Sequence, residues 1–259
     1  FREVSGKATS RVFAVFRIKR SQGFGFVTDS TLAMTVRFKV KLNPKIFRNQ
    51  RGSMTTTNKK PAIIFDFGGV LADWNPYYLY RKVMKSDEEI HLFLEEINFK
   101  YWNLRFDGGY PFAEGIEEMC AEHPQRAELI RRFHTHWVDS LGELLNDTVE
   151  MVRRLKNAGY ALYGLSNWST ETFNQIKDRF VFLDYLEDYV LSGQVKIVKP
   201  SPEIFNILLE RIGRPAAECL FIDDSPVNIK AAQDLGLQTI LFQSCEQMTQ
   251  ELNQMGVVV

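Results

Sequence analysis

The stretch from Pro61 to Asp73 reads PAIIFDFGGVLAD. Four apolar residues, Ala62 to Phe65, run directly into Asp66, and two glycines follow. A short apolar run that ends at turn-forming residues is typical of a buried β-strand. A carboxylate at the end of such a strand can attack an electrophile or bind a metal, and glycines let the backbone approach a ligand closely. An aspartate after a strand is also a common turn residue, so Asp66 by itself does not define a function.

Downstream of this stretch, strand and helix patterns alternate. The predicted strands cover residues 62–65, 161–165, 189–191, 219–222 and 239–242. The predicted helices cover residues 148–157, 170–179, 202–212 and 226–235. Most of these helices are followed by a glycine, which is the expected C-terminal signal. The alternation predicts an α/β fold, a Rossmann-like parallel sheet flanked by helices.

Residues 76–145 interrupt this alternation. They hold helical patterns, among them PYYLYRKVM, DEEIHLFLEEI and PQRAELIRRFHTHWV, and no convincing strand. We therefore expect an inserted helical-bundle cap at residues 76–145, and an α/β core made of residues 54–75 and 146–259.

The composition limits the class of protein. With 45% apolar and 25% charged residues, the 259-residue chain has the composition of a soluble globular protein. No run of eighteen apolar residues occurs, so neither a membrane span nor a membrane partner is predicted. The three cysteines lack the spacing of a zinc site or a redox pair. This usage indicates a reducing, cytoplasmic compartment.

The formal net charge of zero conceals a basic leader. Residues 1–53 contain twelve Lys and Arg residues and two Asp and Glu residues. The rest of the chain carries an equal excess of negative charge. Three interpretations stay open: a translated upstream region with the native start at Met54, an organelle-targeting segment, or a basic arm for nucleic acid or an acidic surface. We predict that the leader is not native or is disordered, and that the protein has no nucleic-acid partner. N-terminal sequencing of the natively expressed protein would separate the three interpretations.

Polar residues follow four of the five predicted strands: Asp66, Ser166, Ser192 and Asp223. Because open parallel sheets bind ligands beyond the carboxyl ends of their strands, these side chains should converge. Asp223 and Asp224 form an adjacent pair of carboxylates, which repel each other unless a cation lies between them. Oxygen ligands of this kind suit Mg²⁺. A helix N-cap would explain one aspartate of the pair but not both.

Two further positions are ambiguous when each is taken alone. Lys199, in the sequence VKPSP, can neutralise anionic oxygens and keep a nucleophile ionised, or it can be an ordinary solvated lysine. Ser166 and Asn167 can donate hydrogen bonds to a phosphate, or they can cap the helix that follows them.

The order and spacing of these residues resemble a known family. Ser166 follows Asp66 by 100 residues, Lys199 comes 33 residues later, and Asp223 comes 24 residues after that. The pattern closely resembles the four motifs of the haloacid dehalogenase (HAD) superfamily, with the acidic pair and its AAQDLG tail as the most specific part. The resemblance covers nearly everything from Pro61 onward. The insert resembles the cap of the helical-cap phosphatase branch.

The resemblance implies a reaction and a set of roles. The first aspartate would attack phosphorus to form an aspartyl-phosphate, with Mg²⁺ as the cofactor and a small phosphorylated molecule as the partner. The protein would be a monomer or a homodimer. The implied catalytic residues are Asp66 and Lys199, the implied magnesium ligands are Asp66, the carbonyl of Gly68, Asp223 and Asp224, and the implied phosphate-binding residues are Ser166, Asn167 and Lys199.

Gly68 departs from the family pattern. In most phosphatases that this chain resembles, a second aspartate at this position serves as general acid and then as base. Such catalysis contributes about 10²- to 10⁴-fold, so its loss favours leaving groups that depart easily, such as the anomeric oxygen of sugar 1-phosphates. The same glycine occurs in bacterial relatives that look like glucose-1-phosphate phosphatases. Asp73 is an alternative proton donor, although an aspartate at that offset is routine in the family where the cap begins.

Two other functions stay open. The dehalogenase branch of the superfamily also uses an aspartate nucleophile, but it works without metal. Where this chain has Asp223 and Asp224, that branch has a motif that contains Ser and Asn. That acidic pair would repel the charge of a 2-haloacid. The other alternative is a catalytically impaired binding or regulatory protein, because Gly68 removes one catalytic group.

Substrate choice is expected to come from the cap and from the loops that face it. The candidate contacts, which either bind a sugar or pack the cap on the core, are Trp74, Asn75, Trp102, Asn103, Arg105, Asp107 and Trp168. Trp168 is included among the substrate-binding residues. His134 and His136 lie two residues apart on a predicted helix, point to different faces, and are not expected to bind a metal together. Cys120 and Cys219 are expected to be packing residues.

Overall fold

The computed structural model describes residues 60–258, and within that range five parallel strands form one sheet in the order β5-β4-β1-β6-β7. The strands are β1 (Ala62–Phe65), β4 (Leu162–Ser166), β5 (Asp188–Leu191), β6 (Cys219–Asp223) and β7 (Gln238–Leu241). Every strand lies within one residue of its predicted limits. The predicted Rossmann-like sheet is therefore confirmed, whereas the basic leader, residues 1–53, lies outside the described residues.

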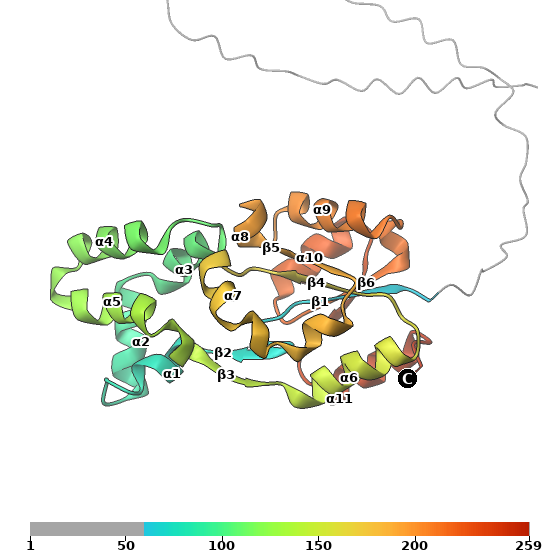
Figure 1. The fold of residues 1–259 in the computed structure, drawn as a ribbon, viewed down its shortest axis with the longest axis horizontal. Helices are drawn as coiled ribbons and strands as arrows, with labels where there is room; N and C mark the ends of the chain where they lie inside the picture. The colour runs from blue at the N-terminus through green and yellow to red at the C-terminus, as the bar shows by residue number, and fades with distance from the viewer. Residues whose placement is uncertain (1–59, 259) are drawn as a thin grey trace, which may run out of the picture. The chain divides into compact units, whose positions relative to one another are not determined.

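Helices cover both faces of the sheet (Figure 1). They are α6 (Asn146–Asn157), α7 (Thr170–Ile176), α8 (Ser192–Val195), α9 (Pro202–Ile212), α10 (Pro226–Asp234) and α11 (Cys245–Gln254). Ala62 and Ile64 of β1 pack in the hydrophobic core beneath α9 and α10, and Ile63 and Phe65 pack in the core that contains α6, α7 and α11. Because both faces are covered, the strand is apolar at every position.

One predicted helix is shorter than expected. The helix predicted for residues 170–179 ends at Ile176, and a 3₁₀ turn, Lys177–Arg179, follows it. The backbone N–H of Phe180 donates to the carbonyl of Lys177, which closes this tighter turn. The turn redirects the chain so that the Phe180 ring packs on Trp168, with ring centroids 5.5 Å apart.

The inserted segment forms a helical unit at one end of the sheet (Figure 1). Its helices are α1 (Pro76–Tyr80), α2 (Asp87–Glu96), α3 (Phe99–Asp107), α4 (Phe112–Glu122) and α5 (Ala127–Thr135). Buried aromatic rings form its interior: Phe106 stacks on Phe112 at 4.1 Å between centroids, and both lie near Phe133. Trp102 is buried there too, and its indole N–H donates to the carbonyl of Gly115.

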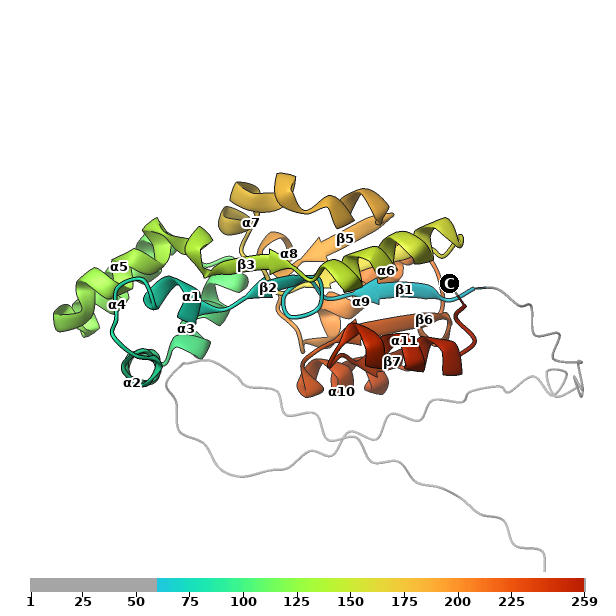
Figure 2. The same ribbon diagram turned by 90° about the horizontal axis from the view of Figure 1, so that it is seen from below.

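A two-stranded antiparallel ribbon links the helical unit to the sheet (Figure 2). Its strands are β2 (Ala72–Trp74) and β3 (Leu141–Leu144), and Ala72 pairs with Leu144. The expectation that residues 76–145 contain no strand is therefore wrong. The sequence LGEL of β3 has no clear alternation, and its partner lies about seventy residues earlier in the chain, so no local pattern could reveal the pairing.

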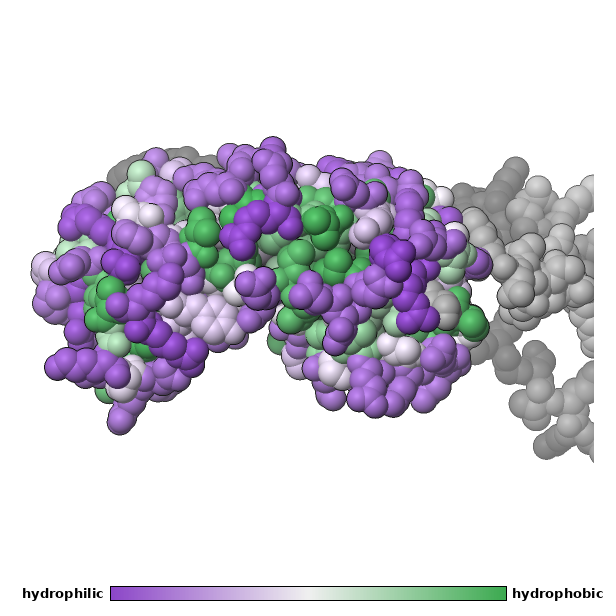
Figure 3. Space-filling view, turned by 60° about the horizontal axis from the view of Figure 1, so that its bottom comes forward, coloured by the Kyte–Doolittle hydropathy of each residue, from purple (hydrophilic) through white to green (hydrophobic). Residues whose placement is uncertain are grey.

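The surface seen in Figure 3 is mostly hydrophilic, with apolar patches near its middle and a notch between the helical unit and the sheet unit. Among the helices of residues 60–258, none combines the length and the apolar character needed to cross a bilayer.

Candidate active site

Three neighbouring strands deliver polar side chains to one edge of the sheet. Phe65 at the end of β1 pairs with Gly164 of β4 and with Ile222 of β6, so Asp66 lies level with the ends of both neighbours. The backbone N–H of Asp66 continues this ladder by donating to the carbonyl of Ile222 at 2.9 Å. Parallel pairing therefore brings Asp66 beside Asp223, although 156 residues separate them in the sequence.

Lys199 connects the two aspartates. Its ammonium nitrogen lies 2.8 Å from Oδ2 of Asp66 and 2.7 Å from Oδ2 of Asp223, and it donates a third hydrogen bond to the carbonyl of Leu165 at 2.9 Å. These three acceptors use all the donors of an ammonium group. Lys199 is 2% exposed, so the predicted lysine is buried and fully paired rather than solvated.

Asn167 holds the backbone of Lys199 in place. The backbone N–H of Lys199 donates to Oδ1 of Asn167 at 2.7 Å, and Nδ2 of Asn167 donates back to the carbonyl of Lys199 at 3.0 Å. Asn167 follows the end of β4, so this amide pair fixes the lysine loop to the sheet. Ser166, the last residue of β4, is buried beside it.

The two adjacent aspartates differ in their surroundings. Asp223 is fully buried, and its carboxylate accepts hydrogen bonds from the backbone N–H of Ser225 and from the side-chain amide of Asn228. Asp224 is exposed and points into the open site. Partial desolvation of its carboxyl by the surrounding site, together with the neighbouring charge of Asp223, raises the pKa of Asp224.

The oxygen atoms of Asp66, Asp223 and Asp224 form a cluster that fits a cation, here called the carboxylate cluster. One carboxylate oxygen from each residue lies within 4.8 Å of the others. Three negative charges against the one positive charge of Lys199 leave two negative charges uncompensated, which matches one divalent ion. An all-oxygen donor set is the type that Mg²⁺ prefers. No other group of three or more potential metal-ligating side chains occurs within residues 60–258.

The ionisation of the buried groups reflects the same charge balance. Burial, which disfavours the charged form, raises the pKa of the Asp66 carboxyl to about 7, although Lys199 acts in the opposite direction. Burial acts to lower the pKa of Lys199, but the charges of Asp66 and Asp223 outweigh it and hold that pKa above its usual range. Lys199 is therefore a permanent cation between two carboxyl groups.

The two glycines after Asp66 have different structural requirements. At Gly69, φ is +73°, and an added Cβ atom would lie 2.4 Å from a carboxylate oxygen of Asp224, so this position needs glycine. At Gly68, an added Cβ atom would meet no heavy atom within 4 Å. Glycine at position 68 is therefore not imposed by packing, and the space beside Asp66 is open.

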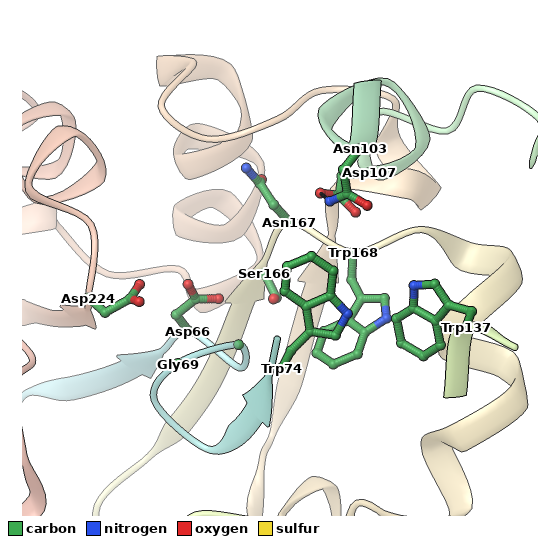
Figure 4. Close-up of a pocket in the computed structure, with 11 residues that line it drawn as sticks. Asp66, Gly69, Trp74, Asn103, Asp107, Trp137, Ser166, Asn167, Trp168 and Asp224 are labelled. Atoms are coloured by element: carbon green, nitrogen blue, oxygen red, sulfur yellow. Dashed lines mark hydrogen bonds between the residues drawn. The ribbon is translucent and has the colours of Figure 1, made fainter. Parts of the chain in front are cut away.

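A cavity of about 230 Å³ opens above the carboxylate cluster (Figure 4). It is lined by Asp66, Gly68, Gly69, Trp74, Asn103, Asp107, Trp137, Ser166, Asn167, Trp168 and Asp224. Figure 4 shows Asp66 and Asp224 on one side, the three tryptophans along another, and Asn103 and Asp107 of α3 above them. The cavity thus combines residues of the sheet edge with residues of the inserted helices.

The structure separates the cap residues that the sequence grouped together. Trp74, Asn103, Asp107 and Trp168 line the cavity, whereas Asn75 caps α1 and Arg105 pairs with Glu118. Trp102 lies in the interior of the helical unit. The sequence reasoning missed Trp137, which meets Trp168 edge to face at 5.9 Å between centroids. No signal in the segment HTHWVDS distinguishes it from a core tryptophan.

The alternative proton donor and the two histidines lie elsewhere. Asp73 is not among the cavity-lining residues, and its carboxylate accepts a hydrogen bond from the hydroxyl of Tyr78 at 2.6 Å. The ring of His134 stacks on Phe112, and His136 is exposed. Cys120 and Cys219 are buried free thiols whose pKa is raised by burial, which agrees with packing roles.

Comparison with known families adds to this geometry. The family model described as haloacid dehalogenase-like hydrolase matches residues 60–236, more than half of the chain. This chain is a haloacid dehalogenase-like hydrolase. The family and the hydrolase class predicted from the four motifs are therefore confirmed.

Relatives of this HAD-like hydrolase include phosphatases. A sesquiterpene phosphatase of Aspergillus oryzae is 29% identical over 188 residues, which are 71% of this chain and 89% of the relative. A phosphorylated carbohydrates phosphatase of Thermotoga maritima is 26% identical over 184 residues, covering 69% of this chain and 83% of the relative.

Solved structures show the same fold. A HAD family enzyme of Bacteroides thetaiotaomicron, in complex with magnesium and inorganic phosphate, superposes on this hydrolase with a TM-score of 0.58. It is 24% identical, and the match covers 72% of this chain and 96% of that protein. The α/β architecture of the HAD-like hydrolase is thus shown by an independent comparison.

Proposed function

We propose that this hydrolase is a magnesium-dependent phosphatase that acts on small phosphorylated metabolites, foremost sugar 1-phosphates, through an aspartyl-phosphate on Asp66. The observation that supports it most is the carboxylate cluster, in which oxygens of Asp66, Asp223 and Asp224 lie within 4.8 Å of one another beside Lys199. Phosphatase relatives and a magnesium- and phosphate-bound structural neighbour agree with this chemistry.

Asp66 is the proposed nucleophile. A carboxylate oxygen of Asp66 forms a bond to phosphorus while the bond between phosphorus and the leaving oxygen breaks, and water then attacks phosphorus and releases the Asp66 carboxylate. Lys199 contacts Oδ2 of Asp66, and its positive charge favours the ionised form of the carboxyl, which is the form that attacks. Ser166 and Asn167 border the cavity beside it and are the proposed donors to phosphoryl oxygens.

The carboxylate cluster and the Gly68 carbonyl are the proposed magnesium ligands. When bound, Mg²⁺ would neutralise the phosphoryl oxygens and the excess charge of the cluster. Asp223 is held rigidly by Ser225 and Asn228, so it provides a fixed ligand, while exposed Asp224 provides an accessible one.

The cavity wall favours a polar substrate over an apolar one. Its volume of about 230 Å³ lies below the range of about 300–1,000 Å³ that is usual for ligand pockets, so it suits a small molecule. Polar side chains of Asn103, Asp107, Ser166 and Asn167 line the cavity. A hydroxyl-bearing ligand can form hydrogen bonds with such groups, whereas an alkyl chain cannot. This consideration supports a sugar phosphate rather than a terpene phosphate.

The leaving group follows from Gly68. This residue offers no acid to protonate the departing oxygen, so an oxygen that departs easily is favoured. The anomeric oxygen of a sugar 1-phosphate is a better leaving group than a primary alcohol. Sugar 1-phosphates should therefore react faster than the corresponding 6-phosphates.

The test is a hydrolysis screen in the presence of Mg²⁺, with sugar 1-phosphates, sugar 6-phosphates and p-nitrophenyl phosphate as substrates. The release of inorganic phosphate is measured. We expect turnover that EDTA removes and that Asp66→Asn abolishes, with 1-phosphates preferred. Metal-independent chloride release from 2-chloropropionate would instead support a dehalogenase. Absence of turnover on all esters, with phosphate and Mg²⁺ still bound, would support a catalytically impaired binding protein.

A further inference from the structure

The cavity contains one acid that the proposed function does not use. Of the residues that line it, only Asp66, Asp107 and Asp224 carry titratable side chains. Asp66 is the proposed nucleophile and Asp224 a proposed magnesium ligand. Asp107, the last residue of α3, belongs to the inserted helical unit and lies across the cavity from Asp66 (Figure 4).

The sheet side of the cavity lacks a proton carrier. The space next to Gly68 is open, since an added Cβ atom would meet nothing within 4 Å. The other lining residues on this side, Ser166 and Asn167, have no group that titrates near neutral pH. A proton for the leaving oxygen must therefore come from the helical unit or from water.

Asp107 is held firmly at the cavity wall. Asn103, one turn earlier on α3, donates from Nδ2 to Oδ2 of Asp107 at 2.9 Å. The hydroxyl of Ser192 donates to the main-chain carbonyl of Asp107 at 2.5 Å and accepts from the backbone N–H of Trp168 at 2.9 Å. Asp107 is thus tied both to its own helix and to the core.

The protonation of Asp107 fits a proton donor. Burial, and to a smaller extent the charge of Asp66, raises its pKa to about 8. The hydrogen bond from the backbone N–H of Ser169 and the charge of Lys199 act in the opposite direction. At neutral pH the carboxyl therefore holds a proton that it can release. A catalytic acid works best when its pKa lies near the working pH.

We propose that Asp107 replaces the acid missing at Gly68 and carries the proton in both steps of the phosphatase reaction. This inference rests on the proposed function. As Asp66 attacks phosphorus, the bond to the leaving oxygen breaks and that oxygen takes the proton of Asp107, which becomes a carboxylate. As water attacks the aspartyl-phosphate, Asp107 takes one proton of the water, the bond from phosphorus to Asp66 breaks, and inorganic phosphate leaves.

The test compares leaving groups in Asp107→Asn, which keeps the shape of the side chain. For a sugar 6-phosphate, kcat/KM falls by about 10²- to 10⁴-fold, and for the corresponding 1-phosphate it falls less. With p-nitrophenyl phosphate, whose leaving group needs no proton, the variant releases a burst of about one p-nitrophenol per protein molecule and then turns over slowly. Intact-protein mass spectrometry detects the accumulated phosphoryl-enzyme.

Two results would overturn the proposal. One is an Asp107→Asn variant with wild-type rates on every ester. The other is an equal loss on all esters without accumulation of phosphoryl-enzyme, because that result indicates a role in binding or folding. A second reading compares leaving groups directly: across substituted phenyl phosphates, kcat/KM should depend more steeply on the pKa of the leaving phenol in Asp107→Asn than in the wild type. Equal slopes in the two proteins contradict the proposal.

Two further variants make the test specific. Asp73→Asn is the matched control, since Asp73 is outside the cavity lining, and it should behave as the wild type does; a burst in this variant would assign the proton to Asp73 instead. Adding Gly68→Asp to Asp107→Asn should restore 6-phosphate hydrolysis from the open space beside Asp66. If the wild type hydrolyses none of the esters, the proposed function fails, whereas activity with a wild-type pattern in Asp107→Asn defeats this inference alone.

Discussion

A single ammonium group holds two strand ends together. Lys199 pairs with Asp66 after β1 and with Asp223 at the end of β6, and all three side chains are buried. A buried ion pair adds little net stability compared with apolar residues, but removing one partner leaves the other charges without compensation. The lysine is therefore as important for folding as for the chemistry proposed at Asp66.

Replacing this lysine should destabilise the protein. In the absence of Mg²⁺, Lys199→Met should lower the free energy of unfolding by about 3–5 kcal/mol, because two buried carboxylates lose their counter-charge. Urea denaturation measures the change. The matched control is Lys230→Met, which removes an exposed ion pair with Asp234 and should cost no more than about 0.5 kcal/mol. Equal stability of the two variants would mean that the carboxyl groups simply take up protons.

The half-buried carboxyl of Asp107 should make stability depend on pH. Its folded-state pKa of about 8 lies above the unfolded value of about 3.9. The folded state therefore binds more protons than the unfolded state between these values, and wild-type stability falls as pH rises through this window. Asp107→Asn lacks the effect, so its free energy of unfolding relative to the wild type should rise from pH 5 to pH 8 and then level off.

Chemical denaturation of both proteins at several pH values measures this difference. Two charged residues act on Asp107: Asp66, which follows β1, raises its pKa, and Lys199 lowers it. Both residues remain in the variant. A difference that stays constant with pH would show that Asp107 is ionised in the folded protein.

At the scale of single elements, α3 and α4 are in direct contact at Gly115. A Cβ atom on Gly115 of α4 would lie 2.4 Å from the ring of Phe106 on α3, and that ring stacks on Phe112 and contacts Trp102. The carbonyl of Gly115 also accepts the indole N–H of Trp102. The glycine lets the two helices approach, and α3 is the helix that carries Asn103 and Asp107 to the cavity.

Gly115→Ala should therefore destabilise the protein, although alanine has a higher helix propensity than glycine. Inside an exposed helix the exchange gains about 1 kcal/mol. Here we expect a net loss of about 1–3 kcal/mol, because the Phe106 ring is enclosed by other aromatic rings and must shift. Thermal unfolding with calorimetry measures the change. Unchanged or increased stability would show that the ring has room to move.

Two strands show what the sequence could and could not predict. β1 is apolar throughout because helices cover both of its faces. This continuous apolar run predicted a strand with the same limits as the observed one. β3 escaped prediction because its four residues, LGEL, pair with a strand far away in the sequence. Local patterns report local burial, and they do not report which distant segment completes a ribbon.

At the scale of the whole molecule, the proposed metal site would couple cation binding to folding. The three carboxylates of the cluster come from segments that meet only in the folded state, so a divalent ion held by them would bind the folded chain and not the unfolded one. A ligand that binds only the folded state stabilises it by about 2.7 kcal/mol at one hundred times its dissociation constant.

Mg²⁺ should therefore raise the melting temperature of the protein relative to EDTA, and more than NaCl does at the same ionic strength. Asp224→Asn should weaken this shift because it removes one ligand and one negative charge from the cluster. Asp234→Asn is the matched control, since that aspartate is exposed and pairs with Lys230. An equal Mg²⁺ effect in all three proteins would contradict a magnesium site at the cluster.

The sequence by itself determined the five strands of the parallel sheet, the family, and the aspartates and lysine at the sheet edge. Strand ends can be recognised from apolar runs, and parallel pairing places successive carboxyl ends at one edge, so Asp66 and Asp223 could be grouped without a structure. Lys199 joined them only through the resemblance to the HAD motifs. The tertiary structure alone decided which cap residues reach the cavity: it brought Trp137 and Asp107 in and placed Trp102 in the interior. A helix turns its residues in every direction, and only its packing against its neighbours decides which of them face the site.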